Sequence, residues 1–176
     1  MKVYIEPQFK RADKGEGGIR RVVENQIKYL PEFGIELVNK PEKADVCNTH
    51  GIEVVNHPTV VVSNHGLYWQ GYHWDNWAHQ ANEKIVRFLR NANVKAVTVP
   101  SQFVATSIQR GTLINPTVVY HGVDTDEWQP PKKRGKYVVW AKNRVDAICD
   151  PVPLNNVARM LPDTRFVTTY GDVRLF

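Results

Sequence analysis

Short apolar runs that suit β-strands alternate along this chain with segments that have the spacing of amphipathic helices. The first run, Val3-Tyr4-Ile5, precedes a glycine-rich loop, and apolar residues then recur at helical spacing from Ile19 to Leu30. The run Thr59–Ser63 is β-branched and apolar on both faces, as a central parallel strand requires. Strands that alternate with helices predict an α/β fold with a doubly wound parallel sheet.

The same pattern predicts the remaining elements. Ser101 suits the N-cap of a short helix that runs to about Arg110, and Gly111 is expected to close that helix. Another helix is expected to end near Asn91, with Trp77 on its buried face. Strands are expected at 35–38, 46–51, 95–99, 117–120, 137–140 and 165–169, with a further short helix at 153–160.

Polar or glycine-containing residues follow most of these predicted strands. In a parallel sheet of this kind, ligands bind beyond the carboxyl ends of the strands. The sequence therefore predicts a ligand-binding rim made of five segments, namely Gly15–Gly18, His50-Gly51, Asn64-His65-Gly66, Ser101 and Gly122.

The glycine-rich loop is the strongest single candidate on that rim. Gly15, Gly17 and Gly18 lie where a strand passes into a helix, and glycine there permits positive φ and close approach of a ligand to the backbone. The free N–H groups and the positive dipole end of the helix favour an anion such as a phosphate. A flexible surface loop is the alternative interpretation.

Composition places the chain among globular proteins. Of its 176 residues, 42% are hydrophobic and 23% are charged, and no apolar run reaches membrane-spanning length. The N-terminus has no signal-peptide pattern, so a cytoplasmic location is expected. The net charge of +5 forms no continuous basic stripe, so nucleic acid is not expected as a partner. Cys47 and Cys149 are expected to be free thiols.

The proline- and lysine-rich stretch at 130–136 reads as a linker. It divides the chain into a first domain at 1–129 and a partial second domain at 137–176. One strand-helix-strand unit does not close a core of its own.

Five segments of the chain, in their order along the sequence, resemble the corresponding segments of GT-B glycosyltransferases of the retaining glycosyltransferase 4 family. They are Gly15-Glu16-Gly17-Gly18, the strand end from Ala44 to Gly51, Ser63-Asn64-His65-Gly66, the stretch from Val97 to Ser101, and the stretch from Val118 to Asp124 followed by Trp128. The resemblance implies a Rossmann-like first domain on the acceptor side and a truncated start of a second Rossmann-like domain. The glutamate pair of the family would lie beyond Phe176, so a chain of this length alone is expected to be inactive or weakly active.

The resemblance also implies a reaction and its site. A hexosyl group would pass from a nucleotide-sugar donor to an unidentified acceptor with retention, without a cofactor or a bound metal, in a protein that is cytoplasmic or peripheral at a membrane. Gly15, Gly17 and Gly18 would approach the donor diphosphate, and Arg144 and Lys142 would grip it. His65 would be the catalytic histidine. The acceptor or sugar would contact His50, Tyr68, Trp69, Tyr72 and Ser101.

Three other readings stay open at this point. Gly15-Glu16-Gly17-Gly18 begins like a nicotinamide-binding fingerprint, although Arg20 stands where the third glycine belongs. Five histidines between His50 and His79, with Asp45 and Asp75, supply residue types that bind metals in a hydrolase, but at no recognisable spacing. The aromatic cluster from Tyr68 to Trp77 suits a non-catalytic module that binds a sugar or an acceptor.

Overall fold

The structure is a computed structural model that describes residues 1–9, 17–51, 55–68, 76–130, 132–133, 135–141 and 149–168. The chain divides into two compact units, Met1–Gly122 and Val123–Phe176, and each is described separately below. The domain and linker boundaries expected from the sequence remain predictions.

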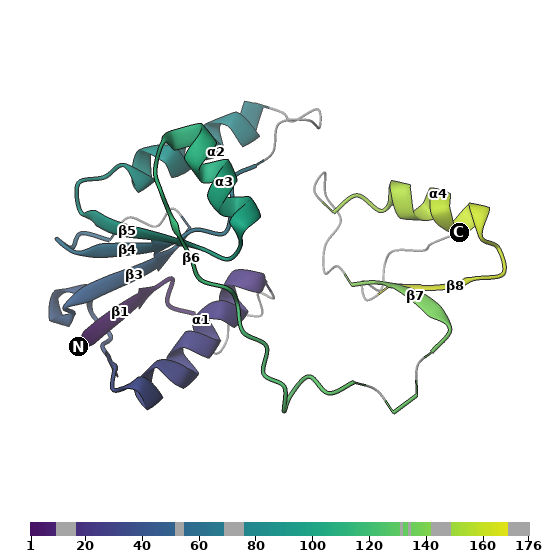
Figure 1. Ribbon diagram of the computed structural model, residues 1–176, viewed down its shortest axis with the longest axis horizontal. Helices are drawn as coiled ribbons and strands as arrows, with labels where there is room; N and C mark the ends of the chain where they lie inside the picture. The colour runs from purple at the N-terminus through teal and green to yellow at the C-terminus, as the bar shows by residue number, and fades with distance from the viewer. Residues whose placement is uncertain are drawn as a thin grey trace. The chain divides into compact units, whose positions relative to one another are not determined.

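The first unit contains a six-stranded sheet in which every neighbouring pair is parallel (Figure 1). The strand order is β2-β1-β3-β4-β5-β6. This confirms the predicted α/β fold with a Rossmann-like parallel sheet. The strands are β1 (Lys2–Glu6), β2 (Glu36–Leu37), β3 (Val46–His50), β4 (Val60–Ser63), β5 (Val94–Val99) and β6 (Thr117–Val118).

Helices cover both faces of the sheet (Figure 1). Helix α1 (Gly18–Tyr29) places Val23 against Val3 and Ile5 on one face. Helices α2 (Asn76–Leu89) and α3 (Gln102–Thr112) pack on the other face, where Tyr4 belongs to the same cluster. Successive residues of a strand point to opposite faces, so β1 contributes alternately to the two cores. Short 3₁₀ turns at Leu30–Phe33 and Pro41–Lys43 complete the connections around β2.

The direction of the chain reverses between β1 and β3. From β1 the chain passes through α1 to β2 at one edge, and it then crosses back to β3 on the other side of β1. All later strands continue in that second direction. The loops after β1 and β3 therefore diverge at a topological switch point, which is where open parallel sheets bind their ligands.

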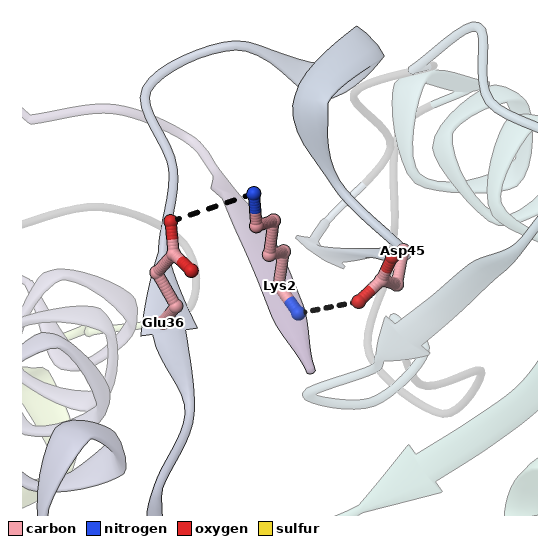
Figure 2. Close-up of polar contacts among 3 residues, drawn as sticks. All are labelled: Lys2, Glu36 and Asp45. Atoms are coloured by element: carbon pink, nitrogen blue, oxygen red, sulfur yellow. Dashed lines mark hydrogen bonds and ion pairs between the residues drawn. The ribbon is translucent and has the colours of Figure 1, made fainter.

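Lys2 links three strands at the opposite, amino-terminal edge of the sheet (Figure 2). Its backbone N–H donates to Asp45 Oδ2 at 2.6 Å, and its Nζ lies 3.8 Å from Glu36 Oε1. Lys2 also pairs in register with Glu36. Because the ion pair is exposed, it contributes little stability.

Of the two predicted ends of α3, the structure confirms only the N-terminal one. Ser101 is the N-cap, and its side chain accepts from the Val104 N–H. The expectation that Gly111 closes the helix is wrong, because Gly111 lies within α3. The C-cap is Leu113, which has a left-handed backbone (φ 62°) although it is not glycine. Its N–H still bonds to Gln109 O, so the helix ends with a satisfied backbone despite the strained residue.

The second unit contains two parallel strands, β7 (Tyr137–Trp140) and β8 (Arg165–Thr168), with helix α4 (Val152–Met160) between them along the chain. Among its described residues, Cys149 is the buried apolar side chain, and the apolar side chains of β7 and α4 are half-buried or exposed. Cys47 and Cys149 are both buried free thiols, as expected. Within the described part of the chain, no helix combines the length and apolar character of a membrane span.

Ile108 should be a main source of stability in the first unit, because its side chain is 0% exposed between α3 and the sheet. We expect Ile108→Ala to lower the free energy of unfolding by about 2–5 kcal/mol through lost burial and a residual cavity. Urea unfolding followed by circular dichroism measures this. Ile27→Ala is the control, since Ile27 is 45% exposed, and it should cost much less. Equal losses in the two variants would contradict the position of the core.

Candidate functional site

Three histidines gather at the edge of the sheet where the strands' carboxyl ends lie, here called the carboxyl edge. His50 is the last residue of β3, His65 follows β4, and His121 follows β6. The rings of His50 and His65 stack with centroids 5.3 Å apart, and those of His65 and His121 lie 5.7 Å apart. We call these three residues the histidine cluster. It lies beside the switch point between β1 and β3.

A direct hydrogen bond joins the first two members of the cluster. His50 Nδ1 lies 3.0 Å from His65 Nε2, and His50 Nε2 lies 2.9 Å from the side-chain oxygen of Gln26 on α1. An amide oxygen only accepts, so His50 Nε2 bears the proton and donates to Gln26. The bare Nδ1 of His50 then accepts from the Nε2–H of His65. With the proton of the neutral His65 ring on Nε2, its Nδ1 is left as an acceptor.

Gln26 is held in turn by a chain of polar side chains that crosses the sheet. Asn48 Nδ2 donates to Gln26 Oε1 at 3.3 Å, Ser63 Oγ donates to Asn48 Oδ1 at 3.0 Å, and Thr98 Oγ1 donates to Ser63 Oγ at 3.2 Å. These residues come from three adjacent strands and α1. A satisfied network of this kind fixes the orientation of each member, so it determines which atom Gln26 presents to His50.

The two residues that follow His50 and His65 are glycines in backbone conformations that other residues rarely adopt. Gly51 has φ of 94° and Gly66 has φ of 128°. Asn64 supports the second turn, because its Oδ1 accepts from the Gly66 N–H at 2.8 Å. The chain therefore turns directly after each histidine, at the end of β3 and two residues beyond β4, and both rings stay at the carboxyl edge.

The environment keeps both bonded histidines neutral. Burial, followed by the nearby rings of His65 and His121, lowers the pKa of His50 from 6.5 to about 4. Burial and then His121 also lower the pKa of His65. The lowered values agree with the hydrogen-bond order, which needs one bare nitrogen on each ring. At neutral pH these two rings are a source of hydrogen bonds and not of positive charge.

The start of α1 lies open at the end of the loop that follows β1. Gly17 is the N-cap without a side-chain cap, and no acidic residue occupies the first turn. A Cβ added to Gly17 or Gly18 would meet no described residue within 4 Å. Positive φ is not what these glycines provide, contrary to the sequence-based expectation, because Gly17 is extended (φ −167°) and Gly18 is helical. What remains is open space over the exposed N–H groups, where an anion is able to approach closely.

The other predicted site residues fall into two groups. Tyr68 is half-buried with its ring 5.0 Å from that of Trp77, and the Ser101 hydroxyl caps α3. The expectation that Trp77 is a core residue is wrong, because its side chain is 41% exposed. The remaining predictions lie outside the described residues: Gly15, Trp69, Tyr72, Lys142 and Arg144.

Sequence reasoning missed two members of the site. His121 stands directly before Gly122, a predicted rim residue, so its place after a predicted strand was the available signal. Nothing in the sequence around Gln26 indicated that it belongs to the site. It is a polar residue in the middle of a helix, and only the packing of α1 beside β3 brings it to His50.

Within the described ranges, no three side chains among His, Cys, Asp and Glu are grouped so as to hold a metal ion. Two of the histidines proposed as metal ligands have other surroundings. The ring nitrogens of His57 lie 2.9 Å from Thr59 O and 3.1 Å from Ala44 O, and His79 is exposed on α2.

Comparison with known families identifies the protein family to which this chain belongs. The family model described as Glycosyltransferase Family 4 matches residues 39–127, about half of the chain, and this span includes β3 to β6 and all three histidines. The chain belongs to glycosyltransferase family 4. No curated protein matches the sequence. Membership supports glycosyltransferase activity with a sugar donor and an acceptor, and it does not favour the nicotinamide-binding interpretation.

The neutral state of His50 makes the stability of this glycosyltransferase unit depend on pH. Because the folded pKa is lowered, the unfolded chain binds more protons between pH 6.5 and about 4, so stability falls as the pH falls through that window. The loss from this residue reaches roughly 3 kcal/mol at the acid end. We expect His50→Gln to flatten the curve of unfolding free energy against pH, measured by urea titration at half-unit steps.

His79→Gln is the matched control, since it removes an exposed histidine from α2. Its curve should retain the acid slope of the unchanged chain. An identical slope in His50→Gln and the unchanged chain would show that His50 is not held neutral.

Proposed function

We propose that this chain is the acceptor-side part of a retaining GT-B glycosyltransferase that moves a hexosyl group from a nucleotide-sugar donor to an acceptor hydroxyl. The observation that supports this most is the histidine cluster at the topological switch point, inside the span that matches the family. A cytoplasmic location, with or without contact to a membrane surface, belongs to the same proposal.

His65 is the residue that contacts the sugar in this proposal. Its Nδ1 is an acceptor, and it has no hydrogen-bond partner among the residues that the structure describes. A neutral imidazole with one bare nitrogen accepts a hydrogen bond from a sugar hydroxyl, and it brings no positive charge close to a cation-like sugar centre. His50 lies behind it, 2% exposed, with both ring nitrogens already bonded, so its role is to hold His65.

The donor diphosphate belongs at the start of α1 in this proposal. As the bond between the sugar carbon and the diphosphate oxygen breaks, negative charge grows on the leaving group, and exposed helix N–H groups stabilise that charge. Gly17 and Gly18 leave the space that this approach requires. The approach of Gly15 to the diphosphate and the grip of Lys142 and Arg144 on it stay predictions from the resemblance, and no resident metal or cofactor is proposed.

Replacement of His65 tests the sugar contact. We expect His65→Ala to lower kcat/KM for sugar transfer about 10- to 100-fold, because one hydrogen bond to a sugar hydroxyl that positions the donor sugar is lost. Mass spectrometry of products from a panel of UDP-, GDP- and ADP-linked hexoses measures this in the full protein.

Two controls accompany that measurement. His79→Ala removes a histidine far from the cluster in sequence and should leave transfer unchanged. His65→Asn, which keeps an acceptor, should recover part of the activity. Full activity in His65→Ala would refute the assignment, and binding of sugars without any transfer would favour the non-catalytic reading.

Gly17 tests the phosphate position independently. Its extended backbone suits any residue and an added Cβ meets no described residue, so Gly17→Trp should leave the unfolding midpoint unchanged while its ring blocks the start of α1. We expect donor binding, followed by isothermal titration calorimetry with UDP, GDP and ADP, to fall by at least about 10-fold. Asn25→Trp, on an exposed position of the same helix, is the control. Unchanged nucleotide binding in Gly17→Trp would place the diphosphate elsewhere.

A further inference from the structure

A pocket of about 660 Å³ lies beside α3, lined in part by residues that follow β4. One wall is the stretch of α3 from Gln102 to Gly111, and the opposite wall is formed by Leu67, Tyr68 and Asn82. Sites for small molecules in proteins have volumes of this order. Its lining shares no residue with the histidine cluster.

The wall opposite α3 is held in place by α2. Asn82 makes two hydrogen bonds to the backbone of Tyr68, since its Oδ1 accepts from the N–H and its Nδ2 donates to the carbonyl, both at 2.7 Å. The Tyr68 ring meets Trp77 edge to face. Leu67 reaches across to α3, where a Cβ on Gly111 would lie 3.7 Å from its Cδ1. The pocket is therefore formed before any ligand binds.

The lining combines apolar surface with uncharged polar side chains and one cation, Arg110. Leu67, Tyr68 and Phe103 supply apolar surface, and Phe103 is 66% exposed. The charged side chain of the lining is Arg110, and no acidic residue lines the described pocket. Among the described residues, no ion pair or side-chain hydrogen bond of Arg110 is found. A guanidinium beside open apolar surface suits a carboxylate or a phosphate attached to an apolar body.

We propose that this pocket binds a small amphiphilic anion, and that this ligand is the acceptor of the sugar. Gln102 and Arg110 are eight residues apart on α3, so the pocket extends along about 12 Å of helix. Arg110 takes the anionic group, and the apolar side chains take the body of the ligand.

The position of the pocket explains why its ligand is the acceptor. Leu67 is two residues from His65, and consecutive Cα atoms are about 3.8 Å apart, so the wall of the pocket begins within about 8 Å of the histidine cluster. A hydroxyl at the far end of a ligand anchored on Arg110 is thus able to reach the carboxyl edge. This second half of the proposal rests on the proposed glycosyltransferase function, whereas the ligand class rests on the pocket alone.

Binding is tested first, without any sugar donor. Hexyl phosphate and hexanoate, titrated into the ¹⁵N-labelled protein, should shift the backbone amide signals of Leu67, Thr106 and Arg110 at lower concentration than 1-hexanol or inorganic phosphate. Arg110→Gln should weaken the binding of both anions about 10-fold or more and leave 1-hexanol unchanged. The two anions, compared with each other, separate a phosphate ligand from a carboxylate ligand.

Three further variants make this test decisive. Lys84→Gln removes one positive charge from α2 outside the lining and should bind hexyl phosphate normally. Thr106→Trp fills the pocket and should abolish binding of every probe, whereas Gln109→Trp on an exposed position of α3 should not. Equal binding by Arg110→Gln and the unchanged protein, or signal shifts confined to residues outside the lining, would overturn the ligand class.

The acceptor role is tested with 6-hydroxyhexyl phosphate, whose hydroxyl lies opposite its anion, against neutral 1,6-hexanediol. With a nucleotide-sugar panel, we expect glycosylated phosphate probe in excess of glycosylated diol, and Arg110→Gln should remove the preference. Hydrolysis of a donor without glycosylation of the probe would overturn the acceptor role alone. No turnover of any donor by the full protein would instead count against the proposed function, while the binding result would stand independently.

Discussion

The alternation of side chains along β3 is the constraint on which the site depends. Cys47 packs into the core beneath α2 and α3, whereas Asn48 bonds with Gln26 of α1. His50 has the same parity as Asn48, and it bonds to the same amide. A shift of one residue in the register of this strand would place Asn48 among apolar side chains and break the link between α1 and the histidine cluster. The parallel pairing of β3 with β1 and β4 therefore positions the polar residues of the candidate site as well as the strands of the sheet.

Charge is distributed unevenly over the candidate site, and the distribution suits a sugar substrate. His50 and His65 are kept neutral by burial, so they provide directional hydrogen bonds where a sugar would lie. Positive character lies elsewhere, at the open start of α1 and at Arg110. Anionic groups of a donor and an acceptor would thus be held apart from the reacting carbon. A site with charged histidines would lack this separation, because it would attract phosphate directly to the sugar position.

Much of the fold could be predicted because it rests on local patterns. Strand candidates such as Thr59–Ser63 and the N-cap at Ser101 follow from periodicity and from the hydrogen-bonding capacity of single side chains. Predictions failed where the outcome depended on packing. Trp77 has core-like spacing, yet its side chain stays 41% exposed at the first turns of α2, where its ring meets Tyr68. Gly111 has the chemistry of a helix stop, yet α3 continues for another residue because the cap forms at Leu113.

The sequence by itself determined the class of the sheet, the residues at its carboxyl edge and the resemblance to a family that the match over 39–127 then established. These follow from local order along the chain: a strand, a glycine or a histidine at its end, and then a helix. Only the tertiary structure decided that Gln26 orients His50, that His50 orients His65, and that Leu67 and Arg110 share a pocket. Each of these pairs is far apart along the chain or lies on different elements, and packing brings them together.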